Sequence, residues 1–121
     1  MTIGFAGLDG ATATLTLDRR PGAAPPLGIV TRRAGVPGSV IALRVDRSAE
    51  PLLVVTVPAE ACTFSTGESL CRLDLSPPEP TFRAIVTAFE RGRAARLEIR
   101  TGGVMTMDGS ASLIGFRRAW R

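Results

Sequence analysis

Residues 62–71 have the sequence Cys-Thr-Phe-Ser-Thr-Gly-Glu-Ser-Leu-Cys, which includes both cysteines of the chain. Thr66-Gly67 has the composition of a two-residue hairpin turn in which Gly67 takes the positive φ that such turns need. Counting outward from that turn places Cys62 opposite Cys71 on a non-hydrogen-bonded rung, where Cα atoms approach to about 4.5 Å. The stretch therefore predicts a β-hairpin that brings the two cysteines together.

The facing cysteines allow two interpretations. A Cα separation of about 4.5 Å is at the short end of the range for a disulfide, and a bridge closing a loop of about ten residues stabilises a fold by roughly 2.7 kcal/mol on the chain-entropy model. Alternatively, Cys62 and Cys71 are buried free thiols, which behave as small hydrophobic side chains. Reactive dithiols usually have Cys-x-x-Cys spacing beside a helix, so a structural staple is favoured over a redox pair.

Strand patterns surround the hairpin. Ala11–Asp18, Val40–Asp46 and Arg93–Arg100 alternate apolar and polar residues, as half-buried strands do. Leu52–Val57 is apolar on both faces, which predicts a central strand covered on both sides. Gly4–Gly10 is rich in small residues and is expected to be flexible.

The remaining segments follow turn residues. Leu27–Arg32 is predicted as a short strand after the proline-rich turn at 19–26. Val104–Met107 is expected to be a strand that ends in a tight turn at Asp108-Gly109. A final strand is predicted over Ala111–Trp120, with Gly115 as a candidate β-bulge.

One helix is predicted over about residues 80–91. Phe82, Ile85, Val86 and Phe89 recur at i, i+3, i+4 and i+7, an apolar stripe at helical spacing that is interpreted as core packing. Gly92 is a natural C′ residue for its end. Short strands, frequent turns and one helix together predict a mainly β fold, a β-sandwich or a small barrel.

The composition excludes several kinds of active site. The 121 residues fit a single domain and include no His, Lys, Tyr, Asn or Gln. Histidine triads, Schiff-base lysines and four-thiolate metal sites are therefore excluded. Met105 and Met107 could be soft copper ligands, but without a third soft ligand nearby strand packing is favoured. No enzyme activity, cofactor or metal is expected.

The acidic residues favour surface roles. Glu60, Glu68 and Asp74 cluster near the hairpin and are a candidate carboxylate pair for acid–base chemistry, but nothing in the sequence fixes their separation. Asp46 and Glu50 flank a turn and lack the additional oxygens that a calcium site needs. Solvated loop and turn positions are the favoured interpretation of all five.

The net charge of +4 comes from 15 arginines, which are scattered among acidic residues and include three adjacent pairs, and only 5% of the residues are aromatic. Nucleic-acid binding is not expected from that pattern. Candidate contact residues for a protein partner are instead Arg32, Arg33, Arg117, Arg118 and Trp120, because tryptophan with arginine is typical of interface hot spots. Trp120 fits an end cap of the core equally well. No transmembrane segment is expected, and the N-terminal residues lack a signal-peptide pattern.

Several fragments occur in the order of one bacterial family. They are Pro26–Ile29, Ala42–Asp46, the cysteine pair, Ala88–Gly92 and the closing segment Ser112–Ala119. Over about residues 25–120 the chain resembles the invasion-associated locus B proteins, which are secreted or periplasmic. The resemblance implies an immunoglobulin-like β-sandwich in an oxidising compartment, which favours the disulfide. It implies no catalytic residues, because the family has no established active-site motif.

These observations predict one domain, with residues 1–24 forming an N-terminal strand and proline-rich turn and residues 25–121 forming the β-sandwich of that family. The expected function is that of a non-enzymatic envelope protein that acts through protein–protein contacts, as an adhesion or invasion-type factor or as an accessory subunit, including one of a membrane-bound assembly. Periplasmic or secreted localisation is expected. The alternative is a structural building block of a particle assembled in the cytoplasm.

Overall fold

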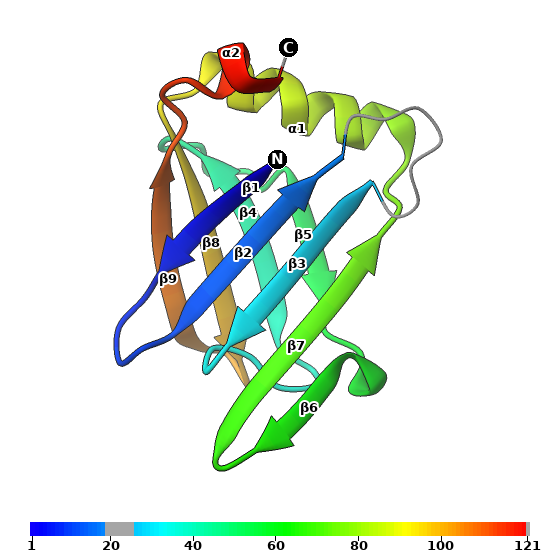
Figure 1. Cartoon of the computed structure of the whole chain (residues 1–121), viewed down its shortest axis with the longest axis vertical. Coiled ribbons are helices and arrows are strands. Elements are labelled where there is room, and N and C mark those ends of the chain that lie inside the picture. The colour runs from blue at the N-terminus through cyan, green and yellow to red at the C-terminus, as the bar shows by residue number, and fades with distance from the viewer. Residues whose placement is uncertain (19–25, 121) are drawn as a thin grey trace.

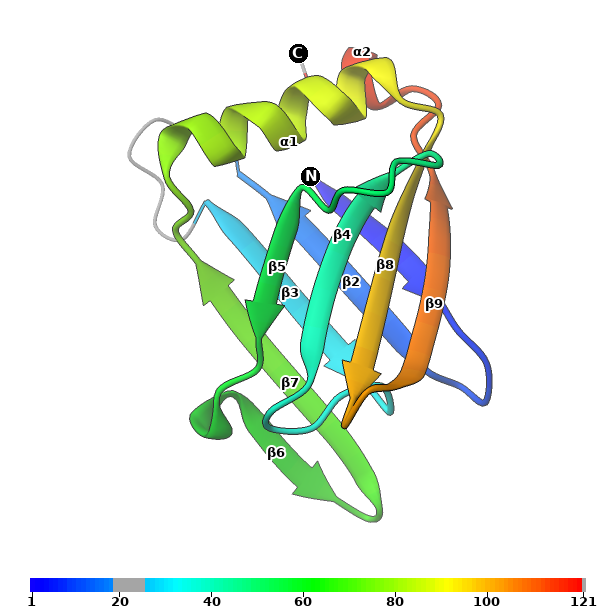
Figure 2. The ribbon, with the colours of Figure 1, turned by 180° about the vertical axis from the view of Figure 1, so that it is seen from behind.

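The structure, a computed structural model, describes residues 1–18 and 26–120. Two antiparallel sheets are stacked as a sandwich, one of five strands in the order β1-β2-β3-β7-β6 and one of four in the order β5-β4-β8-β9 (Figures 1 and 2). The elements in chain order are β1 Thr2–Ala6, β2 Thr12–Leu17, β3 Leu27–Arg32, β4 Val40–Val45, β5 Leu53–Thr56, the 3-10 turn η1 Ala59–Ala61, β6 Cys62–Ser65, β7 Glu68–Leu75, α1 Glu79–Arg91, β8 Ala94–Thr101, β9 Val104–Ser112 and α2 Phe116–Trp120. The mainly β prediction is confirmed, and the two helices lie together across one end of the sandwich.

Alternating burial produces the core, as the sequence pattern predicts. Along β2, β3 and β8 every second side chain points between the sheets, while its neighbours face outward. Seven of these inward side chains are 0% exposed: Leu15, Leu17, Leu27, Ile29, Ala95, Leu97 and Ile99. Removing such side chains from water is the main driving force for stacking the two sheets. The predicted turn over 19–26 lies outside the described residues, except for Pro26.

The prediction that Leu52–Val57 is a central strand is wrong. Its strand, β5, lies at the edge of the four-stranded sheet, and Val54 is 56% exposed. Composition alone does not distinguish an apolar edge strand from a covered one. The prolines at 51 and 58, which flank β5, are the residues expected next to an edge strand, because proline cannot donate to a ladder.

The N-terminal residues form a strand that the sequence did not suggest. β1 pairs with β2 from Thr2↔Thr16 to Ala6↔Thr12, so its second half lies in Gly4–Gly10, the region expected to be flexible. Phe5 is only 2% exposed, so the strand contributes to the core. The sequence did not predict this strand because its glycine and alanine have little β-propensity.

The predicted turn at Asp108-Gly109 is also wrong, since both residues lie inside β9. Gly109 lies where β9 passes β1, and a Cβ atom on it would be 3.1 Å from the Cβ of Phe5. Glycine therefore permits the close approach of the two sheets rather than a turn. Met107 is 3% exposed and packs in the core, in agreement with the packing interpretation.

The final strand predicted over Ala111–Trp120 is replaced by a strand end, a turn and a helix. β9 ends at Ser112, Gly115 takes a positive φ of 86° in the turn, and α2 follows. The helix packs its aromatic residues on α1, which buries Phe116 to 4% exposure. The predicted bulge at Gly115 is therefore a turn that admits this second helix.

Helix α1 is confirmed, with Ile85 and Phe89 both 0% exposed on its inner face. The role predicted for Gly92 is wrong, because its φ of −82° is not the left-handed value of a C′ glycine. A glycine is required at position 92 because there is no room for a larger side chain. A Cβ atom on Gly92 would be 2.3 Å from Cγ1 of Val45 and 2.9 Å from the carbonyl oxygen of Ala88.

We expect Gly92→Ala to lower the free energy of unfolding by about 2 kcal/mol, because the added methyl group overpacks the junction of α1 with the sandwich. Gly4→Ala is the matched control, since a Cβ atom there meets nothing within 4 Å. It should leave stability unchanged or raise it slightly. Urea denaturation followed by circular dichroism measures both variants, and equal stabilities would contradict the steric explanation.

Candidate functional site

The cysteine hairpin forms as the sequence predicts. Thr66 and Gly67 take φ values of 50° and 78°, and the register pairs Cys62 with Cys71. The two sulfur atoms are joined in a disulfide, with the Cα atoms 4.0 Å apart. The structure therefore has the bridged form of the pair rather than two free thiols.

Strand β6 of this hairpin is an open edge. It is the last strand of the five-stranded sheet, and the hairpin projects past the other sheet at the end away from the helices (Figures 1 and 2). Because rungs alternate in an antiparallel pair, the backbone N–H and C=O groups of Cys62 and Phe64 point away from β7. The Phe64 side chain is 63% exposed. This edge carries no charged residue.

An open cleft of about 550 Å³ adjoins the hairpin. Phe64 and the hairpin turn line it on the β6–β7 hairpin, and residues 33–36 of loop 33–39 line it together with Thr101 of β8 and Thr106 of β9. Val36 adds an apolar side chain to the loop wall. The cleft therefore combines an exposed aromatic ring with an adjacent strand edge.

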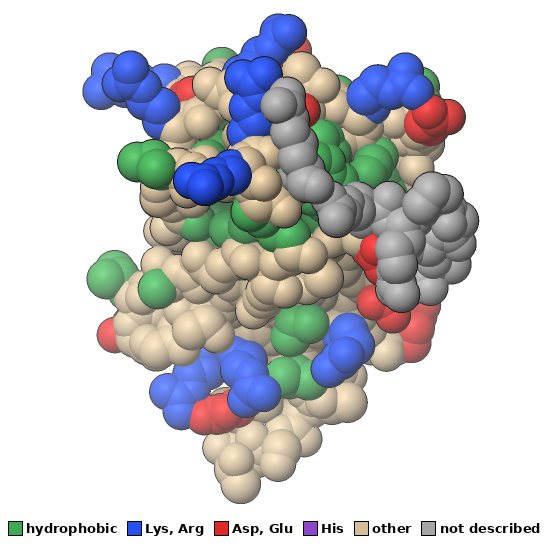
Figure 3. All heavy atoms as spheres, turned by 45° about the horizontal axis from the view of Figure 1, so that its top comes forward, with side chains coloured by type: hydrophobic (Ala, Val, Ile, Leu, Met, Phe, Trp, Pro, Cys, Tyr) green, Lys and Arg blue, Asp and Glu red, His purple; other side chains and the backbone are tan. Residues whose placement is uncertain are grey.

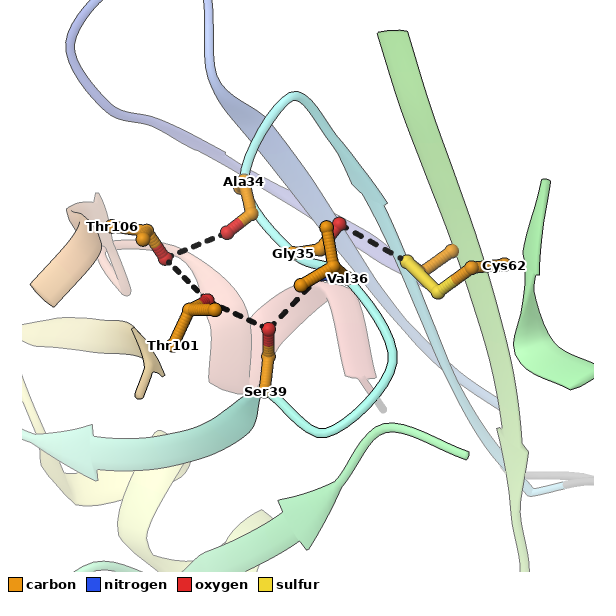
Figure 4. The surroundings of a disulfide bond; sticks show 8 residues. Ala34, Gly35, Val36, Ser39, Cys62, Thr101 and Thr106 are labelled. Carbon is orange, nitrogen blue, oxygen red and sulfur yellow. Dashed lines mark hydrogen bonds between the residues drawn. A yellow bond between two sulfur atoms is a disulfide. The ribbon is translucent and has the colours of Figure 1, made fainter. Parts of the chain in front are cut away.

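Loop 33–39 is held in place by hydroxyl groups. Ser39 Oγ accepts a hydrogen bond from the Val36 N–H (3.0 Å) and lies 2.7 Å from Thr101 Oγ1. Thr106 Oγ1 donates to the carbonyl oxygen of Ala34 at 2.7 Å. Figure 4 shows these groups on one side of the loop and the disulfide on the other. The loop wall of the cleft is thus tied to β8 and β9.

Arg33 reaches across the hairpin end of the molecule. Its Nε donates to Glu68 Oε1 at 2.8 Å, but both side chains are substantially exposed, at 51% and 40%. Such a surface ion pair contributes little to stability. Arg32, the last residue of β3, is exposed on the outer face of the sheet. Both candidate contact residues therefore lie at the same end of the sandwich as Phe64.

The other predicted contact residues lie at the opposite, helical end. Trp120 stacks on Phe116 with ring centroids 5.7 Å apart and contacts Phe82 at 6.3 Å. It is half-buried, which agrees with the end-cap interpretation, whereas Arg117 and Arg118 are exposed. The structure thus separates the predicted contact residues into two groups at the two ends of the sandwich (Figure 1).

The helical end has a hollow of its own. It has a volume of about 400 Å³ and is lined by residues 1–4, 111–116 and Ala119. Figure 3, with this end turned forward, shows hydrophobic side chains gathered between arginines. Ile114, which is 90% exposed, lines this hollow.

The acidic candidates do not form a paired site. Glu68 and Asp74 are six positions apart on β7, a separation of about 20 Å along a strand. Glu60 lies in η1. Asp46 has a structural role, since its carboxylate accepts the backbone N–H groups of Arg93 and of the next residue at 3.0 Å each. Within the described ranges, no three His, Cys, Asp or Glu side chains are placed to hold a metal ion.

Sequence reasoning missed Phe64 and the hydroxyl cluster. Phe64 could have been found from the hairpin register, because it lies two residues from Cys62 and therefore on the same face of an edge strand. The hydroxyl cluster had no local signal. Ser39, Thr101 and Thr106 are far apart in the sequence, and a β-bulge near Arg100 shifts the strand register beside Thr106.

Comparisons with known proteins leave the fold and these surfaces as the basis for inference. No family model matches the sequence, and no curated protein or solved structure is significantly similar to it. None of the helices in the described part of the chain combines the length and apolar character needed to cross a bilayer.

Proposed function

We propose that the chain is a non-enzymatic protein of the bacterial envelope that binds a partner protein at the hairpin end. The observation that carries this proposal is the exposed Phe64 on an uncharged edge strand beside a cleft. Edge strands of monomeric proteins are usually blunted by charge, proline or a bulge. An unprotected edge with an exposed aromatic ring is suited to a contact surface.

The occupant we propose is an extended strand of a different protein. The free backbone groups of Cys62 and Phe64 can hydrogen-bond such a strand, and the cleft can accept one of its apolar side chains. A second copy of this chain fits less well. Two strands of only four residues bury far less than the roughly 1,200 Å² of a stable interface.

The proposed location is the periplasm or the cell exterior. The Cys62–Cys71 disulfide supports it, because disulfides persist in oxidising compartments. The resemblance to the invasion-associated locus B proteins supports the same assignment, and the proposal includes the immunoglobulin-like sandwich of that family. Mass spectrometry of protein from its native source, alkylated before and after reduction, tests the location. Free thiols there would instead support the cytoplasmic building block.

The contact surface is tested by placing a photo-crosslinking residue at position 64 and irradiating native envelopes. We expect a discrete crosslinked partner. In a separate affinity pull-down without crosslinking, we expect Phe64→Arg to reduce recovery of that partner at least tenfold, because the substitution removes the aromatic contact.

Ile114→Arg is the matched control, since it alters an exposed apolar residue at the other end of the sandwich. It should leave recovery unchanged. Loss of the partner in Ile114→Arg but not in Phe64→Arg would place the contact at the helical end and overturn the proposal.

A further inference from the structure

One buried hydroxyl group has no hydrogen-bond partner. Thr31 on β3 is 1% exposed, and its Oγ1 contacts no donor or acceptor among the described residues. Native structures satisfy nearly all such groups, because an unpaired buried hydroxyl is costly. A second state of the site, in which this hydroxyl gains a partner, would explain it.

The residues around Thr31 include a sulfur that could be that partner. Thr31 is the register partner of Cys71, and both side chains are buried between the sheets. Gly35 closes the same site from loop 33–39, since a Cβ atom on it would be 3.5 Å from Thr31 Oγ1. The Gly35 carbonyl oxygen lies 3.4 Å from Cys71 Sγ (Figure 4). A hydroxyl, a carbonyl and a sulfur therefore meet in one buried place.

In the disulfide, Cys71 Sγ carries no hydrogen, so it cannot donate a hydrogen bond to the Gly35 carbonyl oxygen. After reduction, the Cys71 thiol can donate to the Gly35 carbonyl oxygen, and its sulfur can accept from the Thr31 hydroxyl. Gly35 gains this hydrogen bond only when the disulfide opens, because only the thiol has an S–H. The Thr31 hydroxyl, which makes no hydrogen bond to the bridged sulfur, gains a stronger acceptor in the Cys71 thiolate, which is free to turn toward it once the bridge opens.

The two sulfur atoms also differ in access. Cys71 is 0% exposed and has β3 as its neighbour on the side away from Cys62. Cys62 is half-buried and lies on the edge strand, with no strand beyond it among the described residues. Thiol–disulfide exchange requires a thiolate to approach one sulfur in line with the bond. Only the approach to Cys62 is from the open edge.

We propose that Cys62–Cys71 is a directional thiol-exchange site for a dithiol reductant, with Cys62 as the attacked sulfur and Cys71 as the leaving sulfur. A thiolate of the reductant forms a mixed disulfide with Cys62, and the electron pair of the broken bond goes to Cys71. Cys71 takes a proton, with Thr31 and Gly35 as its hydrogen-bond partners. The second thiol of the reductant then attacks the mixed disulfide and releases Cys62, so the reductant leaves as a disulfide.

This proposal does not depend on the identity of the partner protein. Opening the bridge frees β6, which carries Phe64, from its covalent tie to β7. The oxidation state of the pair therefore sets how firmly the proposed contact edge is held.

The direction of attack is tested with reduced glutathione at short times, before a second glutathione molecule reduces the mixed disulfide. The protein is incubated with glutathione, quenched with iodoacetamide and mapped by peptide mass spectrometry. We expect the glutathione adduct on Cys62 and the alkyl group on Cys71 in at least nine-tenths of opened molecules. An equal distribution, or an adduct mainly on Cys71, would overturn the proposal.

The role of Thr31 is tested by Thr31→Val, which removes the hydroxyl group with little change of shape. In glutathione redox buffers we expect the variant to shift the equilibrium roughly fivefold towards the disulfide, because the reduced sulfur loses a hydrogen bond. Thr16→Val, on the exposed face of β2, is the control and should not shift it. A purely structural role for Thr31 would change overall stability and leave the redox equilibrium in place, which would contradict the proposal.

Discussion

Phe89→Ala is expected to lower the free energy of unfolding by about 3–5 kcal/mol, the typical cost of removing a buried phenylalanine side chain. Phe89 is 0% exposed on the inner face of α1. Its ring meets that of Phe116 edge-on, with centroids 5.4 Å apart, and Phe116 stacks on Trp120. Truncation would therefore leave a cavity and remove the aromatic contact that joins the two helices.

Phe64→Ala is the matched control, because it removes the same atoms from a side chain that is 63% exposed. It should change stability by less than about 0.5 kcal/mol. Urea denaturation followed by circular dichroism gives both values, and Trp120 fluorescence, from the only tryptophan, reports on the helical end separately. Similar losses in the two variants would mean that α1 does not cover the core as described.

A loss of this size is large relative to the whole stability of a small domain, which is about 5–15 kcal/mol. We therefore expect α1 to be essential for the sandwich rather than an appendage. The helix covers the end of the sandwich at which β1 and β9 border the hollow lined by Ile3 and Leu113. Without it, the inward side chains at that end of both sheets would face water.

Much of the fold could be predicted from local periodicity. Ala11–Asp18, Val40–Asp46 and Arg93–Arg100 alternate with period 2, and the stripe ending at Phe89 recurs with the helical period, so burial followed directly from the pattern. The hairpin was predictable because its turn and its two cysteines fix one register. Each of these signals is contained in a stretch of about ten residues.

The errors arose where sheet position, rather than local pattern, decides the structure. Gly109 occurs in an Asp-Gly pair, but contact with Phe5 across the two sheets keeps it in a strand. Gly92 was predicted to end the helix through a left-handed conformation, whereas the close approach of Val45 from β4 is what requires a glycine there. Phe116 and Trp120 lie in a helix that packs on α1, and Leu113 is buried just before the turn that leads into it, an arrangement that alternation along a strand does not predict.

The candidate site was only partly predictable for the same reason. The cysteine pair and Arg33 were identified from the sequence, but the cleft depends on three segments that are distant along the chain. Arg117, Arg118 and Trp120 share a composition with Arg32 and Arg33 but lie at the other end of the sandwich. Composition can suggest that residues belong to a surface, but only the topology shows that they belong to the same one.

Opening the disulfide is expected to lower the free energy of unfolding by about 2.7 kcal/mol, the chain-entropy estimate for a loop of about ten residues. For a domain of this size, that corresponds to a fall of about 10 °C in the midpoint of thermal unfolding. Thermal denaturation followed by circular dichroism, with and without a phosphine reductant, measures it. An unchanged midpoint in the reduced protein would contradict the stapling role.

Cys62→Ala is the control for this measurement, because it cannot form the bridge and should show no response to reductant. Its midpoint should lie close to that of the reduced wild-type protein, since both retain the buried Cys71 thiol beside Gly35.

The loss should also be local. Strand β7 remains paired with β3 over six register positions, from Leu27↔Leu75 to Arg32↔Leu70, whereas β6 has only four pairs and no other neighbour in the part of the chain that the structure describes. Amide hydrogen exchange should therefore quicken in β6 on reduction and stay slow in β3, because opening requires only the edge strand to detach. Equal loss of protection in both strands would show that the bridge holds the whole sheet and would remove the basis for a contact edge controlled by oxidation state.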